Sequence, residues 1–326
     1  MASPQTIPYV TLDVFTKSIF SGNPLGVVFL PNPTALAQTQ KQEIAKEFNY
    51  SETIFVHPVD PQTPTQQRID IFTTDRELPF AGHPTIGAAS WALYLSPDKG
   101  DVTTLLTKAG PIPISLRPSG DEAAALIPHD VRIHQKRFPV QELLRLHPTV
   151  KPFVGSTARE EAGFPIVSIV NGMTQIHVEL PSLEALAAVG PAAGGESVPA
   201  VDVSQGGYLD EGWGGHGLVV LYFYVRDVMD EVTGKKVIRT RMFLQSEEDP
   251  ATGSAASGLA ALLVLRDGAG ADDQLHRSFY VVQGVEMGRR SDIGLRVSLK
   301  SNREGIESVE LSGSSVKVAK GEIRVY

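Results

Sequence analysis

Short apolar runs recur along the chain, and many of them alternate with polar residues or are rich in β-branched side chains. This pattern is typical of strands, either half-buried or buried on both faces. The predicted strands cover residues 9–15, 26–30, 53–56, 68–72, 112–116, 165–170, 175–180, 218–225, 237–243, 278–282, 294–299 and 308–311.

Helical periodicity is confined to fewer segments. Residues 34–48 follow Asn32-Pro33, a favourable helix start, and place their apolar residues on one face. Residues 84–95 and 255–266 are apolar on nearly every side, which predicts two buried helices. Two buried helices among many strands favour an α+β fold built from two units, and no parallel βαβ winding is indicated.

An internal repeat relates the two halves of the chain. With a shift of 171 residues, 68–94 overlays 239–265 without a gap, and seven of the 27 positions are identical. Each copy reads as a strand, an acidic turn, a proline, a glycine and an apolar helix. Two such units can share Gly and Pro for turn geometry alone, but we interpret the agreement as a duplication. The identical pairs are Arg68/Arg239, Phe72/Phe243, Glu77/Glu248, Pro79/Pro250, Gly82/Gly253, Gly87/Gly258 and Ala89/Ala260.

Two segments interrupt this pattern. Residues 121–150 have mixed polarity and little strand pattern, so we expect them to carry the crossover between the halves. Residues 190–217 are rich in Gly, Ala and acidic residues, which predicts a long surface loop.

Composition narrows the classes of protein. The 326 residues suffice for two domains, and 42% hydrophobic with 20% charged residues is ordinary for a globular protein. The net charge of −8 argues against a nucleic-acid partner. The absence of cysteine excludes disulfides, thiolate metal sites and cysteine nucleophiles. We find neither a secretory signal nor an apolar stretch of about 20 residues, so we expect no membrane association and a cytoplasmic location.

Common cofactor and nucleophile motifs are missing from the sequence. There is no phosphate-binding Gly-rich loop ending in Lys-Ser/Thr, no His-Glu-x-x-His, no Gly-x-Gly-x-x-Gly after a strand and no Gly-x-Ser-x-Gly. The eight histidines are dispersed. We therefore expect no metal and no organic cofactor.

The duplicated motif delivers the chain, in both copies, to a glycine near the first turn of a buried helix. Unpaired N–H groups and a partial positive charge make such a helix start suitable for an anion, for example a substrate carboxylate. His83 lies at this point in the first copy, and Asp249 and Ser254 in the second, with His83 and Ser254 at equivalent positions. The alternatives are that Asp249 and Ser254 only cap the helix and that His83 is a structural histidine.

A further candidate is Glu52, in the turn 50–53 before a predicted strand. The 171-residue shift places it on Phe223, so the second half offers no equivalent base. The candidate acid–base set is therefore asymmetric, with one Glu, one His and one Asp. If Glu52 is buried, its pKa rises toward neutrality, which suits proton abstraction from carbon and return of the proton elsewhere. The alternative is a solvated carboxylate.

These residues lie in motifs that resemble the PhzF family, the phenazine-biosynthesis-like isomerases of the diaminopimelate epimerase-like superfamily. The motifs run in order over almost the whole chain: DVFT at 13–16, GNPLGVV at 22–28, YSET at 50–53, ELPFAGHPT at 77–85, EDPATGSA at 248–255 and QGVEMGR at 283–289.

The resemblance implies two pseudo-symmetric halves, each a curved, mostly antiparallel sheet wrapped round a central helix, with the active site in a cleft between them. The expected halves are 1–130 with a C-terminal strand at about 312–326, and 131–311. The archetype of the family isomerises trans-2,3-dihydro-3-hydroxyanthranilate by a cofactor-free proton transfer, and family members are commonly homodimers.

The resemblance also assigns residues. The catalytic positions match Glu52, His83 and Asp249, and the substrate-binding candidates are Asn23, Ser51, Gly82, Gly253 and Ser254. Related amino-acid epimerases use two cysteines, which this chain lacks. The segment 190–217 looks longer than the usual connection.

We therefore expect an isomerase acting on a small, carboxylate-bearing, amino-acid-like molecule. Two alternatives stay open: a binding or interaction protein that keeps the fold without turnover, and a lyase or cyclase reaction at the same site.

Overall fold

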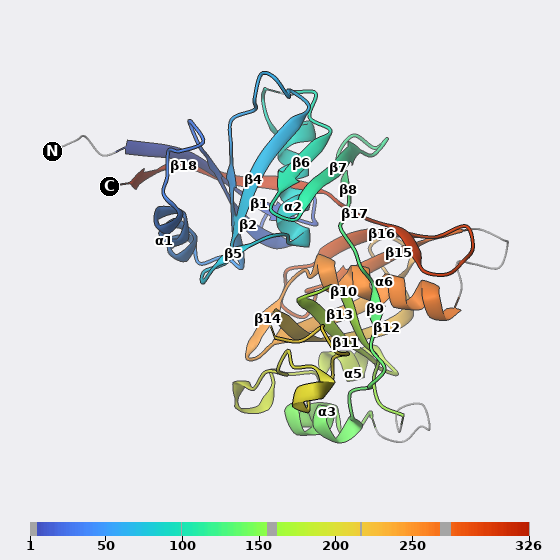
Figure 1. Cartoon of the computed structure of the whole chain (residues 1–326). Helices are drawn as coiled ribbons and strands as arrows, with labels where there is room; N and C mark the ends of the chain where they lie inside the picture. Colours follow the sequence, from blue (N-terminus) through green and yellow to red (C-terminus); the bar gives the residue numbers. More distant parts are fainter. Residues whose placement is uncertain (1–4, 99, 155–161, 216, 268–274, 326) are drawn as a thin grey trace. The chain divides into compact units, whose positions relative to one another are not determined.

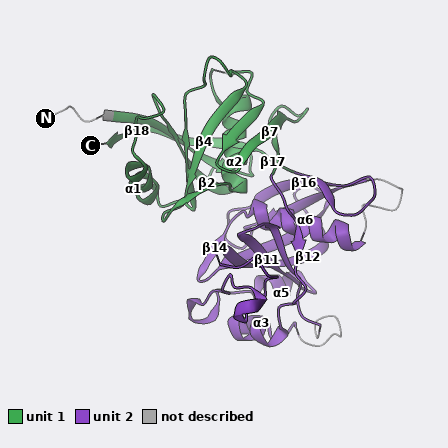
Figure 2. Cartoon of the chain, viewed as in Figure 1, with its two compact units in different colours: residues 1–127, 310–326 green, residues 128–309 purple. Residues whose placement is uncertain are grey.

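The computed structural model describes residues 5–98, 100–154, 162–215, 217–267 and 275–325, and it divides the chain into two compact units. Unit 1 comprises Met1–Ile127 and Glu310–Tyr326, and unit 2 comprises Pro128–Val309 (Figure 2). Figure 1 labels most of the helices and strands of each unit. None of the helices in the described part of the chain combines the length and apolar character that a membrane-spanning segment needs.

Unit 1 is a mixed sheet around a buried helix. Its elements are β1 (Gln5–Val14), β2 (Asn23–Phe29), α1 (Gln38–Phe48), β3 (Glu52–Val56), β4 (Gln66–Phe72), β5 (Glu77–Leu78), α2 (Gly82–Ser90), the π-helical turn η1 (Trp91–Leu95), β6 (Thr104–Thr107), β7 (Gly110–Leu116), β8 (Ala123–Leu126), the end of β17 (Ile306–Gly313) and β18 (Ser315–Val325). The strand β1 pairs with both β2 and β18, and β8 pairs with β17. The C-terminal strands are therefore part of the first unit.

Unit 2 repeats this plan around α6. Its elements are β9 (Arg132–Ile133), α3 (Val140–Leu146), η2 (Pro148–Val150), β10 (Ile166–Val170), β11 (Met173–Glu179), α5 (Leu183–Ala187), the 3₁₀ turns η3 (Ala193–Gly195) and η4 (Val203–Gln205), β12 (Leu218–Met229), β13 (Lys236–Leu244), β14 (Glu247–Asp249), α6 (Gly253–Asp267), β15 (His276–Gln283), β16 (Ser291–Leu299) and the start of β17.

The expectation that parallel winding is absent was wrong. In unit 1 the pairs β2–β3 and β4–β6 are parallel, and in unit 2 the pairs β11–β12 and β13–β15 are parallel. Helix α1 lies in the connection between β2 and β3, and α2 and α6 lie in the connections β4–β6 and β13–β15. Parallel neighbours need a crossover of this kind, and a buried apolar helix supplies it.

Strand pairing explains the internal repeat. The identical residues Phe72 and Glu77 pair with each other across β4 and β5, and their counterparts Phe243 and Glu248 do the same across β13 and β14. Both buried helices begin at the repeated glycine, Gly82 in α2 and Gly253 in α6.

Close helix–sheet packing explains a second identical pair. An ideal Cβ on Gly87 would lie 2.3 Å from Leu25 Cδ2, and one on Gly258 would lie 2.4 Å from Gln175 Oε1. Both glycines are in helix interiors, so turn geometry does not account for them. The close approach of the helix to the neighbouring strand favours glycine in both units, because a Cβ would force the Leu25 or Gln175 side chain to move.

The 171-residue shift does not extend to Glu52. Thr53 pairs with Phe72 in unit 1, whereas Leu221 pairs with the equivalent Phe243 in unit 2. A β-bulge between Val225 and Val228 belongs to the longer connection in unit 2. The strand pairings therefore align Glu52 with Val220, whereas the sequence shift predicted Phe223. Val220 and Phe223 are both apolar, so unit 2 still offers no equivalent carboxylate.

Several predicted boundaries also change. The first helix begins at Gln38 and not at residue 34, because Asn32 Oδ1 accepts from the Thr34 N–H (3.1 Å) and holds a turn. The helix predicted at 84–95 is α-helical only to Ser90, and a π-helical turn follows. The segment 121–150, expected to have little strand pattern, contains β8, β9 and α3. The run Ala123–Leu126 was missed because alanine has a low intrinsic strand preference.

The segment 190–217 is not a simple surface loop. Val198 and Leu209 are buried in the main apolar cluster of unit 2. The Asp210 carboxylate accepts hydrogen bonds from Arg132 Nε (2.7 Å) and from the Gln135 backbone N–H (3.0 Å). These contacts fasten the Gly-rich segment to β9 and the turn after it.

A buried ion pair in unit 1 links α1 to β4. Asp70 Oδ2 lies 2.5 Å from Lys41 Nζ and 2.7 Å from His57 Nε2, and all three side chains are buried. Burial alone would raise the pKa of Asp70, but hydrogen bonds from His57 and Lys41 outweigh it and hold that pKa well below its usual range.

Asp70→Asn is therefore expected to lower the free energy of unfolding at pH 7 by about 3 kcal/mol, because Lys41 keeps its buried charge without a carboxylate. A carboxyl whose pKa is lowered by folding stabilises the folded state at pH values above its unfolded-state pKa of about 3.9. The difference in unfolding free energy between Asp70→Asn and wild type therefore shrinks as pH falls below about 4. Urea unfolding at pH 7 and pH 3.5 measures both effects. The control is Asp121→Asn, which removes an exposed pair with Lys17; equal losses in both variants would contradict the role of burial.

Candidate active site

Four of the candidate residues come together in unit 1. Asn23 begins β2 and Glu52 begins β3, and these strands are parallel neighbours. Ser51 Oγ lies 3.5 Å from Asn23 Oδ1, and Glu52 Oε2 lies 3.3 Å from His83 Nδ1, in the first turn of α2. The N-terminal ends of β2, β3 and α2 therefore bring together two polar side chains, a carboxylate and an imidazole.

The Glu52 carboxyl lies in a largely buried position. Its side chain is 17% exposed and that of His83 is 4% exposed. Burial raises the pKa of Glu52 to about 7, against the opposing effect of a hydrogen bond with Ser51. A carboxyl with this pKa holds and releases a proton near neutral pH, which a general acid–base group must do.

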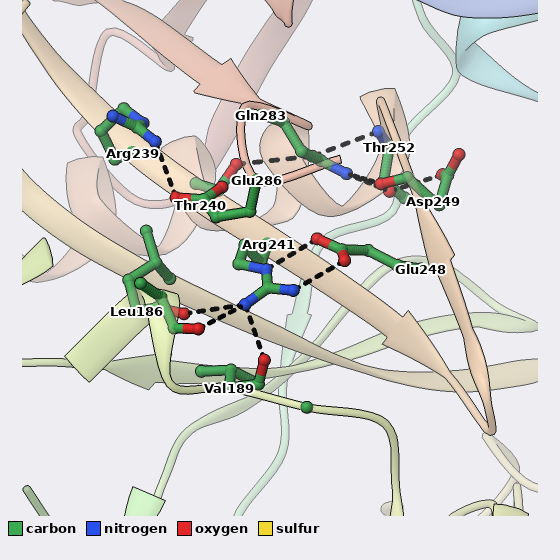
Figure 3. A network of polar contacts seen from close by, with 12 residues as sticks. Leu186, Val189, Arg239, Thr240, Arg241, Glu248, Asp249, Thr252, Gln283 and Glu286 are labelled. Atoms are coloured by element: carbon green, nitrogen blue, oxygen red, sulfur yellow. Dashed lines mark hydrogen bonds and ion pairs between the residues drawn. The ribbon is translucent and has the colours of Figure 1, made fainter. Parts of the chain in front are cut away.

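The remaining candidates come together in unit 2. Asp249 ends β14, Gly253 begins α6 and Ser254 follows it. Asp249 Oδ2 accepts a hydrogen bond from Thr252 Oγ1 at 2.6 Å (Figure 3). The Ala251 N–H lies 3.5 Å from Asp249 Oδ1. Asp249 thus organises the turn that leads into α6. The predicted cleft that would join this group to the group in unit 1 stays a prediction.

A second carboxylate in the same strand is tied down by an arginine. Arg241 Nε and one terminal nitrogen each lie 2.7 Å from a different Glu248 oxygen, which is a two-point contact. The other terminal nitrogen donates to the backbone carbonyls of Leu186 and Val189 (Figure 3) and to that of Ala187. Strand β14, which ends at Asp249, is therefore linked through Arg241 to the backbone at the end of α5.

Sequence reasoning did not single out Arg241, Thr252 or Gln283. Thr252 and Gln283 lie inside the EDPATGSA and QGVEMGR motifs, so their positions were marked but not their contacts. Gln283 is fully buried, and its amide contacts the turn at Asp249. The one sequence signal for it is a glutamine at the end of an apolar strand, directly before Gly284.

No group of three or more His, Asp or Glu side chains within the described ranges is arranged to hold a metal ion. The polar residues gathered in each unit are instead paired with hydroxyl, amide and imidazole groups.

Comparison with known proteins identifies a family for this chain. A model of the PhzC-PhzF family, described as phenazine biosynthesis-like protein, matches residues 12–321. The trans-2,3-dihydro-3-hydroxyanthranilate isomerase of Pseudomonas chlororaphis is 32% identical over 319 residues, covering 97% of this chain and 98% of that protein. An uncharacterized isomerase of Mesorhizobium japonicum is 31% identical over 324 residues, covering 98% and 99%.

A solved structure agrees on the fold. The crystal structure of a Bacillus anthracis protein of the PhzF family superposes with a TM-score of 0.72 at 20% identity, covering 98% of this chain and 100% of that chain. The predicted α+β fold of the diaminopimelate epimerase type is thereby confirmed.

Proposed function

Because the chain belongs to the PhzC-PhzF family and is an isomerase of the PhzF type, we propose that it moves a proton between carbon atoms of a small, carboxylate-bearing, amino-acid-like substrate without a cofactor. One observation carries this proposal. Glu52 is a largely buried carboxyl with a pKa of about 7, and it lies 3.3 Å from His83 Nδ1.

Each residue has a distinct part in the proposed reaction. The Glu52 carboxylate takes the proton from the substrate carbon, and Glu52 in its protonated form returns a proton to another carbon. His83 and Asp249 orient the substrate and share in the proton transfer. Removing the proton leaves negative charge on the substrate, and preorganised donors that face this charge lower the barrier.

Each unit offers donors suited to a carboxylate. Gly82 and Gly253 begin helices, where backbone N–H groups lack partners within the helix and carry partial positive charge. A glycine has no side chain that would block the approach of a ligand to these N–H groups. Asn23, Ser51 and Ser254 add polar side chains at the starts of β2, β3 and α6.

Proton NMR in D2O tests the proposal directly. The panel holds trans-2,3-dihydro-3-hydroxyanthranilate, the substrate in the name of the Pseudomonas chlororaphis relative, together with amino and hydroxy acids. We expect one compound to lose a carbon-bound proton signal or to form an isomer of the same mass. Saturable binding without exchange would favour the binding protein, and a product of lower mass would favour a lyase.

A further inference from the structure

In the sheet of unit 2, polar side chains replace an aliphatic layer found in unit 1. The ladders that align Glu52 with Val220 also align the interior positions of the two sheets. The corresponding pairs, unit 2 first, are Tyr222 and Ile54, Thr240 and Ile69, Gln175 and Leu25, and His177 and Val27. All eight side chains are buried, so solvent exposure does not explain the difference.

Burying polar groups is less favourable than burying the aliphatic groups that the same architecture accommodates in unit 1. Burial lowers the pKa of His177 to about 3, so its ring is neutral, and burial raises the pKa of Tyr222, so its hydroxyl stays protonated. In this layer the Tyr222 hydroxyl lies 3.1 Å from Thr240 Oγ1, whereas both ring nitrogens of His177 and the Gln175 Oε1 have no hydrogen-bond partner among the described residues.

Gln283 connects this layer to the turn at Asp249. Its Oε1 accepts hydrogen bonds from the Tyr222 hydroxyl (3.0 Å) and the Thr252 backbone N–H (3.3 Å). Its Nε2 donates to the Asp249 carbonyl (2.8 Å) and to Thr252 Oγ1 (2.9 Å). The amide therefore bridges both ends of the turn, as Figure 3 shows.

These partners fix which way the amide faces. A reversed amide would put its oxygen against the Asp249 carbonyl and its NH₂ group against the Thr252 N–H, and neither contact is a hydrogen bond. The backbone also adapts to this arrangement, because an ideal Cβ on Gly284 (φ +74°) would lie 2.7 Å from the Pro250 carbonyl oxygen. Gln283 and Gly284 together are thus fitted to the turn.

The direction of the amide sets the direction of the next hydrogen bond. Thr252 Oγ1 already accepts from Gln283 Nε2, so its own proton points to Asp249 Oδ2, 2.6 Å away. Unit 1 has Leu78 and Ala81 where unit 2 has Asp249 and Thr252, so it cannot form this contact.

We propose that Gln283 and Thr252 form a positioning relay that holds one Asp249 oxygen as a hydrogen-bond acceptor and thereby fixes the orientation of the carboxylate for its part in the reaction. Its catalytic consequence rests on the proposed function, in which Asp249 contacts the substrate. Thr252 and Gln283 are positioning residues, since they act through Asp249.

The first measurement needs no substrate. The protein is labelled with ¹³C at the carboxyl carbon of its aspartates and titrated by NMR. The Asp249 signal is identified because it is lost in Asp249→Asn. A hydrogen bond to the ionised form favours ionisation. We therefore expect the titration midpoint of Asp249 to move upward in Thr252→Val and Gln283→Met, and to stay at the wild-type value in Thr252→Ser.

Thr174→Val is the matched control. It removes another buried threonine hydroxyl of unit 2, which lies 2.6 Å from Ser168 Oγ, and it should leave the Asp249 midpoint unchanged. An unchanged midpoint in both Thr252→Val and Gln283→Met would overturn the relay. Because Gln283→Met keeps a side chain of similar length and adds no charge, it keeps the test valid if Thr252→Val does not fold.

The second measurement uses the compound that undergoes exchange in D2O. We expect Thr252→Val to lower kcat about tenfold with KM within twofold of wild type, and Thr252→Ser to restore the rate, while Thr174→Val keeps it. A raised midpoint with unchanged kcat would support the relay and contradict the role of Asp249 in the proposed function. Wild-type turnover in Asp249→Asn would contradict that role as well.

Discussion

Glu52→Gln is expected to lower the rate of proton transfer by about 10²–10⁴-fold, the usual contribution of a positioned acid–base group. The amide nearly preserves the shape of the side chain beside His83 but cannot take up or return a proton. Because proton abstraction needs the carboxylate, wild-type activity should rise with pH through about 7, the pKa that burial gives Glu52. Rates of exchange in D2O between pH 5 and 9 measure this limb of the profile.

The same variant should be no less stable than wild type. The pKa of Glu52 is raised to about 7 by burial, so the folded state binds a proton that the unfolded state releases above about pH 4.5. Wild-type stability therefore falls, relative to Glu52→Gln, as pH rises from about 4.5 through 7. Glu47→Gln, at an exposed position of α1, is the control for both measurements. Full activity in Glu52→Gln would remove the proposed base from the mechanism.

Arg241→Met is expected to cause the largest loss of stability, about 4–5 kcal/mol. The Arg241 side chain is 9% exposed and that of Glu248 14% exposed, so the substitution leaves a largely buried carboxylate without its partner. It also removes the donor to three backbone carbonyls at the end of α5. Urea unfolding at pH 7 measures the loss.

Two further variants separate burial from charge. Arg241→Met/Glu248→Met removes both charges, and we expect it to recover part of the stability, because no unpaired ion remains. Arg145→Met removes pairs with Glu142 and Glu196 at exposed positions and should leave the unfolding midpoint unchanged. If Arg241→Met unfolds at the same urea concentration as wild type, the anchoring role of this pair is wrong.

The candidate site could be predicted in part because its residues lie in short contiguous motifs. His83 follows the glycine that begins α2, and Asp249 precedes the glycine that begins α6 by a few residues, so local sequence marks both. Glu52 was marked by its turn, at the start of β3. Its pKa depends on burial by the surrounding side chains, which the turn sequence does not reveal.

The relay could not be predicted for a related reason. Gln283 and Thr252 are 31 residues apart in the chain and meet because β15 ends beside the turn after β14. The parallel pairing of β13 with β15 brings them together, and alternation of apolar residues is the same for parallel and antiparallel neighbours. Periodicity therefore does not predict which strands pair with one another.

By itself, the sequence determined the α+β class, the internal duplication, the two apolar helices and the motifs that place the chain among PhzF-type isomerases. These features depend on local periodicity and on glycine and proline positions, which a linear pattern records. Only the tertiary structure decided the parallel crossovers, the alignment of Glu52 with Val220, the burial that raises the pKa of Glu52 and the hydrogen bonds of Gln283. Each of these depends on contacts between residues distant in the chain, and such contacts form only when the sheets close around their helices.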